Sequence, residues 1–146
     1  MLLGDIWSRR GDLTRARESY EKALAEYQLL VKSDPTNPNW QRNLSIYYER
    51  MGNVLLAEGD RLGALEQYRT GLGIVQGLAT VDPANPQWQL ALSISHEKLG
   101  DVLLAQGDAA GALREYEADL SIAERLAAAD PANGDRQEDV AISHAH

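Results

Sequence analysis

The strongest constraint on this chain is that its sequence repeats at a step of 48 residues. The segment from Asn37 to Pro83 returns in large part between Asn85 and Pro131, and residues 3–35 carry part of the same text. Four kinds of marker keep this step: Gly4, Gly52 and Gly100; the Gly-Asp pairs at Gly11, Gly59 and Gly107; Tyr20, Tyr68 and Tyr116; and Pro35, Pro83 and Pro131. Periods of about 20–50 residues are typical of stacked supersecondary units, so we expect a repeat array.

Turn and capping residues divide each repeat into two helices. Gly59 suits the left-handed position just after a helix, and Asp60 suits the N-cap of the next one. At the other joint Pro83 ends a helix, Asn85 caps its successor and Pro86 takes the first helical position. The repeat is therefore predicted to be a helical hairpin with a second turn joining it to its neighbour.

Apolar spacing between these turns is helical, as in the stripe Leu44, Tyr48, Met51 and Leu55. No alternating run indicates a strand. The chain is therefore predicted to be all-α, with helices over 1–10, 12–33, 38–58, 60–81, 86–106, 108–129 and 134–146.

Three glycines, Gly71, Gly73 and Gly77, stand in the second half of the helix expected over 60–81. Glycine in a helix interior costs about 1 kcal/mol relative to alanine. Two interpretations stay open. The simpler one is local weakness of the helix, and the alternative is close backbone approach by a neighbour or ligand.

The pattern resembles the tetratricopeptide repeat, which runs Trp-x2-Leu-Gly-x2-Tyr, Ala-x3-Phe and Pro. In this chain it reads Tyr48-x2-Met51-Gly52-x2-Leu55, Ala64-x3-Tyr68 and Pro83, and the other copies keep the same places. The resemblance implies a right-handed α-solenoid of antiparallel helix hairpins. It would hold about seven helices in three 48-residue repeats.

The repeat is longer than the family period of about 34 residues. The excess is divided evenly, so each helix is expected to be about two turns longer at the same end of the hairpin. Trp40 and Trp88 lie in this extension, and we expect them to be core residues that face Leu29, Leu30, Leu78 and Leu126 rather than ligand contacts.

The whole chain, residues 1–146, is predicted to be a single repeat domain. Repeat 1 holds a partial first helix (1–10) and 12–33, repeat 2 covers 38–81, repeat 3 covers 86–129, and 134–146 start a further helix. In this register both ends fall within a helix. The expectation is a piece of a longer array, or head-to-tail self-association through the terminal half-helices.

Composition narrows the classes of partner. The net charge is −8, and an acidic chain repels phosphate groups, so nucleic acid and membrane surfaces are disfavoured. The absence of cysteine excludes disulfides and thiol catalysis. No apolar run is long enough to span a bilayer, and the expected compartment is the cytoplasm.

The sequence offers no constellation that indicates an enzyme, a cofactor or a metal. The Gly71-Leu72-Gly73 segment follows no strand and is not a phosphate loop. His96 occupies an aromatic position of the motif and is expected to be a half-buried structural histidine. His144 and His146 would point different ways on a helix. We therefore expect no catalytic residues.

In the family, the first helix of each pair lines a concave groove. The resemblance places on this face Asp5, Arg9, Arg42, Ile46, Glu49, Asn53, Leu56, Leu90, Ile94, Glu97, Asp101 and Leu104. Some family members clamp a C-terminal carboxylate with Lys and Asn, but Glu49 and Glu97 stand where such a Lys would be. The expected ligand is therefore a basic or amphipathic segment of another protein.

Three functions remain open. The first is a non-catalytic scaffold that binds a peptide or helix of a partner protein. The second is a structural, self-associating array without a groove ligand. The third is a regulatory piece of a larger multidomain signalling protein.

Overall fold

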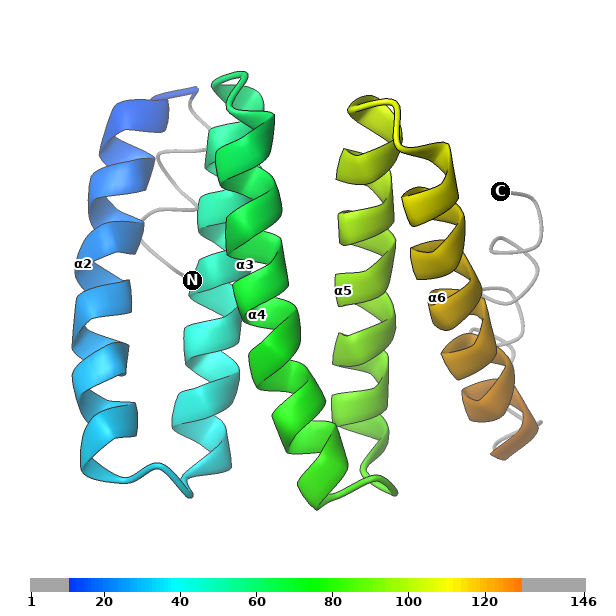
Figure 1. The fold of residues 1–146 in the computed structure, drawn as a ribbon. Helices are drawn as coiled ribbons and strands as arrows, with labels where there is room; N and C mark the ends of the chain where they lie inside the picture. Colours follow the sequence, from blue (N-terminus) through cyan, green and yellow to red (C-terminus); the bar gives the residue numbers. More distant parts are fainter. Residues whose placement is uncertain (1–10, 130–146) are drawn as a thin grey trace. The chain divides into compact units, whose positions relative to one another are not determined.

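The computed structural model describes residues 11–129, and every regular element in this range is an α-helix (Figure 1). The helices are α2 (Leu13–Ser33), α3 (Pro38–Ala57), α4 (Arg61–Val81), α5 (Pro86–Ala105) and α6 (Ala109–Ala129). Their ends lie within one residue of the predicted ranges, so the all-α class is confirmed for this part of the chain. The helices expected over 1–10 and 134–146 lie outside the described residues, and seven helices in three repeats stay a prediction.

The step of 48 residues also relates the helix boundaries. The helices α2, α4 and α6 begin at residues 13, 61 and 109 and end at 33, 81 and 129. The helices α3 and α5 begin at 38 and 86 and end at 57 and 105. The repeated turn residues thus start and stop the helices at matching positions.

The chain divides into two compact units, Met1–Ile74 and Val75–His146. The boundary falls inside α4. Within the first unit, α2 packs on α3, and α3 packs on the first part of α4. Within the second unit, the last turns of α4 pack on α5, and α5 packs on α6.

Asparagine caps start α3 and α5, as predicted. The Asn37 side chain accepts hydrogen bonds from the backbone N–H groups of Asn39 and Trp40, and Asn85 accepts one from Gln87. A proline follows each cap at the first helical position, where its missing N–H costs little. These local groups fix where the two helices begin.

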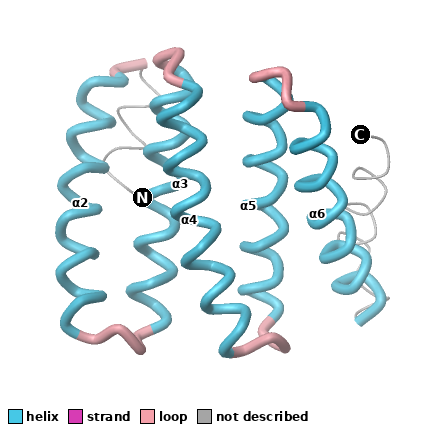
Figure 2. The backbone as a smooth tube through the Cα atoms, viewed as in Figure 1, coloured by secondary structure: helices cyan, strands magenta, loops and turns pink. Residues whose placement is uncertain are grey.

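Glycine and aspartate form the other turns, which are short loops in Figure 2. Gly59 and Gly107 both have φ of 88°, a left-handed conformation that side chains rarely adopt. Asp60 and Asp108 then each accept a hydrogen bond of 2.9 Å from the backbone N–H group three residues on. The predicted turn chemistry is therefore present in both turns.

One core cluster of the first unit lies between α2 and α3. It consists of Ala16, Tyr20, Leu24, Leu44, Met51 and Val54, with further partly buried side chains around it. Among these, the ring of Tyr47 stacks on that of Tyr27 at a centroid distance of 5.4 Å. An ion pair of 2.5 Å between Arg17 and Glu58 joins α2 to the residue after α3.

Gly71 separates the two interpretations of the helical glycines. It is buried, and a Cβ atom there would lie 3.3 Å from the carbonyl oxygen of Ser45 on α3. Gly73 and Gly77 are exposed and would meet nothing within 4 Å. The close backbone approach therefore applies at Gly71, whereas local weakness describes the other two positions.

The two tryptophans differ in burial. Trp88 is buried and packs on Leu78 and Ala79, which confirms its expected core role. Trp40 is only half-buried, and Leu29 is 69% exposed, so the expectation that Trp40 faces Leu29 within the core is wrong. The reason is register, because Leu29 lies about 140° around α2 from the buried Ala16.

Alanine substitutions at Gly71 and Gly73 test the close approach. Gly73→Ala should raise the free energy of unfolding by about 0.5–1 kcal/mol, because it removes a glycine from an exposed helix position. Gly71→Ala should gain less or lose stability, since its methyl group meets a backbone oxygen that cannot move freely. Chemical denaturation of both variants measures the difference. An equal gain at the two positions would contradict the packing described here.

Candidate functional site

One face of α5 presents apolar side chains to solvent. Leu90, Ile94 and Leu104 are 48%, 39% and 54% exposed, and Glu97 and Asp101 on the same face are also exposed. These five positions fall within about 80° of one another around an α-helix. The predicted site residues of α5 thus share one exposed face, which we call the α5 face.

The matching residues of α3 form a less exposed face in the first unit. Arg42 and Leu56 at its two ends are exposed, whereas Ile46, Glu49 and Asn53 between them are half-buried. Glu49 also lies 3.8 Å from the guanidinium of its neighbour Arg50. The predicted Asp5 and Arg9 lie outside the described residues.

Two of the predicted groove residues also hold the hairpins together. The hydroxyl of Tyr68 on α4 donates a hydrogen bond of 2.5 Å to Asn53 Oδ1 on α3. In the second unit, the hydroxyl of Tyr116 on α6 donates one of the same length to Asp101 on α5. The sequence analysis missed this role, although the 15-residue spacing from polar residue to tyrosine occurs in both repeats.

The environment of Tyr116 disfavours its phenolate. Burial, the hydrogen bond to Asp101 and the negative charges of Asp101 and Glu97 together raise the pKa of Tyr116 above its ordinary value. Tyr116 therefore stays a neutral donor toward Asp101 through the physiological range. This arrangement is structural and supplies no acid or base near neutral pH.

Two further polar pairs join α5 to α6. Nδ1 of His96 lies 2.6 Å from a carboxylate oxygen of Glu115, and the histidine side chain is 13% exposed. Ser93 donates its hydroxyl to the buried carboxylate of Asp119. In the first unit the matching Ser45 donates instead to the backbone carbonyl of Arg42. His96 thus occupies the half-buried position expected for it.

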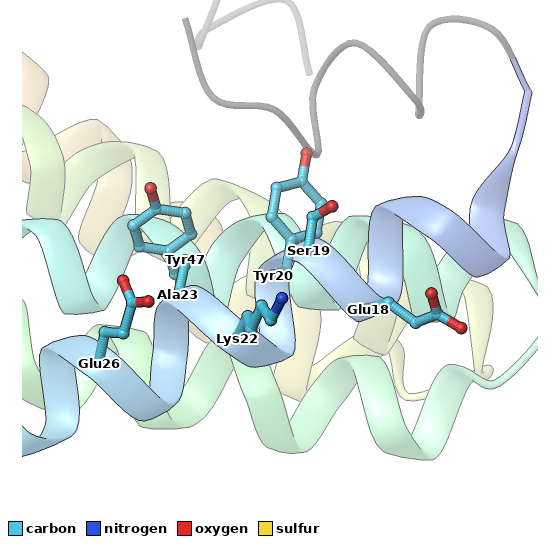
Figure 3. Close-up of a pocket in the computed structure, with 7 residues that line it drawn as sticks. All are labelled: Glu18, Ser19, Tyr20, Lys22, Ala23, Glu26 and Tyr47. Atoms are coloured by element: carbon cyan, nitrogen blue, oxygen red, sulfur yellow. The ribbon is translucent and has the colours of Figure 1, made fainter.

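A separate pocket of about 390 Å³ lies on the side of α2 (Figure 3). Its lining residues are Glu18, Ser19, Tyr20, Lys22, Ala23, Glu26 and Tyr47. In the close-up, Tyr20 and Tyr47 point the same way, and Glu18 points away from them. None of the groove residues predicted on α3 and α5 is among these lining residues.

Within residues 11–129, no group of three or more His, Asp or Glu side chains is placed to hold a metal ion. None of the helices α2 to α6 is both long and apolar enough to cross a membrane.

No protein-family model and no curated protein matches the chain. Among solved structures, the crystal structure of MamA aligns over 99% of this chain and 84% of its own, with 20% sequence identity and a TM-score of 0.32.

Alanine substitutions at the two matched serines test the buried pair. Ser93→Ala leaves the Asp119 carboxylate without the donor described here, and should lower the free energy of unfolding by about 1–3 kcal/mol. Ser45→Ala removes only a bond to the backbone of its own helix and should cost well below about 1 kcal/mol. Equilibrium denaturation of both variants measures the two costs. Equal losses of unfolding free energy in the two variants would show that the Ser93 hydroxyl does not stabilise the buried Asp119 carboxylate.

Asp101→Asn should lower the pKa of Tyr116, because it removes a negative charge and leaves an oxygen acceptor like that of Asn53. A raised pKa in the folded state stabilises folding at pH below the ordinary tyrosine value of about 10, and this contribution is lost as the pH rises further. As the pH rises above about 10, the free energy of unfolding of the variant should therefore fall less than that of the parent protein. NMR titration of labelled tyrosine measures the shift, with Glu97→Gln as the smaller control. An unchanged pKa would refute the pairing.

Proposed function

We propose that this chain is a non-catalytic protein-interaction scaffold, and that the α5 face binds a helix or peptide of a partner protein. The observation that carries the proposal is the exposure of Leu90, Ile94 and Leu104 on one helix face. Large apolar side chains that share an exposed face are a feature of interaction sites. The resemblance of the repeat to the tetratricopeptide pattern supports the same function.

The chemistry of the α5 face favours an amphipathic partner with basic residues. The three apolar side chains offer area that a partner's leucine or aromatic residues can cover. Glu97 and Asp101 lie between Ile94 and Leu104, so a Lys or Arg of the partner would meet them there. An acidic segment would be repelled by the same two carboxylates.

Peptides selected from a random display library against the full chain test this function. Selected sequences should combine apolar residues at helical spacing with Lys or Arg. Ile94→Asp in the protein should weaken their binding by about tenfold or more, because a charge replaces an apolar contact. Fluorescence anisotropy measures the Kd.

The matched control is Leu113→Asp on α6, where the leucine is 57% exposed and lies on another helix. Its effect on binding should stay within about twofold, as for surface changes away from an interface. The charge requirement is tested by Glu97→Lys, which should weaken basic peptides and lower their sensitivity to salt. Equal effects of Ile94→Asp and Leu113→Asp would refute the assignment to the α5 face.

A further inference from the structure

A second pocket, of about 460 Å³, lies between the start of α5 and the end of α6. The turn before α5 and its first residues contribute Pro83, Pro86 and Gln89, and α6 contributes Ile122, Leu126 and Ala129. These walls are mainly apolar, and pockets of about 300–1,000 Å³ commonly bind ligand groups. The pocket includes no residue of the α5 face, so it is a different surface from the one proposed above.

The position of Leu126 at the pocket can be compared with the matching position 48 residues earlier in the repeat. Leu126 on α6 corresponds to Leu78 on α4, which is buried against the Trp88 indole together with Ala79. Leu126 and its neighbour Ala127 are only half-buried. On α4 this position, Leu78, is covered by Trp88 of the next helix. On α6 the matching position, Leu126, faces the pocket instead.

Trp88, which covers Leu78, has a defined position at the start of α5. Trp88 is the third residue of α5, three positions after the Asn85 cap and two after Pro86. One period further along the sequence, the residue at this position is Arg136, which lies outside the described residues. The sequence therefore does not repeat the tryptophan at this position.

We propose that the pocket binds the tryptophan of a partner helix that begins with the pattern Asn-Pro-x-Trp. The cap and the proline define the helix start, and so present the indole at a fixed place, as they do at Asn85–Trp88. Indole is the largest apolar group available to fill such a pocket. Arg125 at the pocket wall adds a guanidinium, which favours the face of an aromatic ring.

A peptide with the sequence of residues 82–106, fluorescently labelled, is the probe for this site. Fluorescence anisotropy with the unlabelled full chain should show saturable binding. A peptide with alanine in place of its tryptophan should bind about tenfold more weakly or worse, because the indole provides the main contact. The absence of binding by the first peptide, or equal binding by both, would overturn the proposal.

Two exposed alanines at the end of α6 provide matched protein variants. Ala129 lines the pocket and Ala128 does not. Ala129→Arg should raise the Kd of the peptide by about tenfold or more by filling the pocket, whereas Ala128→Arg should change it by less than about twofold. Arginine is a good helix former, so both variants should keep the circular dichroism spectrum and Tm of the parent.

The variants also separate this proposal from the proposed function. Ile94→Asp should leave binding of the tryptophan peptide unchanged, and Ala129→Arg should leave binding of the display-selected peptides unchanged. Equal binding of the tryptophan peptide to the two arginine variants would place it elsewhere on the chain and refute the site.

Discussion

In each hairpin, a tyrosine of the second helix packs against a glycine of the first. A Cβ atom on Gly52 would lie 2.5 Å from the ring of Tyr68, and one on Gly100 would lie 2.8 Å from the ring of Tyr116. No side chain fits between backbone and ring at these distances. The ring can therefore lie on the helix backbone, and its hydroxyl reaches the polar residue that follows the glycine. Tyr68 is buried, and an unpaired buried hydroxyl costs about 1–3 kcal/mol, so Gly52, Tyr68 and Asn53 form one set.

The two repeats have the same helix boundaries but make different contacts between the helices of each hairpin. In the first unit Ser45 bonds to its own helix, and the backbone of α4 approaches closely at Gly71. In the second unit the position of Gly71 is taken by Asp119, and Ser93 donates to it. The boundaries do not change because caps and left-handed glycines set them locally. Contacts in the middle of a hairpin are consequently free to vary.

This division explains what could be predicted from the sequence. Helix ends were predicted to within one residue, since Asn85, Pro86 and Gly59 act on neighbouring backbone groups. The role of Gly71 could not be decided, because sequence does not give the distance between two helix backbones. The bond from Tyr68 to Asn53 had a detectable signal in its repetition, but it required knowing which residues of two antiparallel helices lie opposite each other. The α5 face followed from helical spacing together with the family pattern, whereas the pocket at the end of α6 depends on how far two helix ends are separated.

On the α5 face, the apolar and the charged residues would contribute differently to binding. Asp101 already accepts the hydroxyl of Tyr116, so part of its hydrogen-bonding capacity is used within the hairpin. Exposed ion pairs contribute about 0–1 kcal/mol and are screened beyond about 8 Å at physiological salt. Burial of apolar area contributes about 25 cal/mol per Å², so contacts to Leu90, Ile94 and Leu104 would supply most of the affinity. The carboxylates of Glu97 and Asp101 would mainly exclude acidic partners, which is a contribution to specificity rather than to strength.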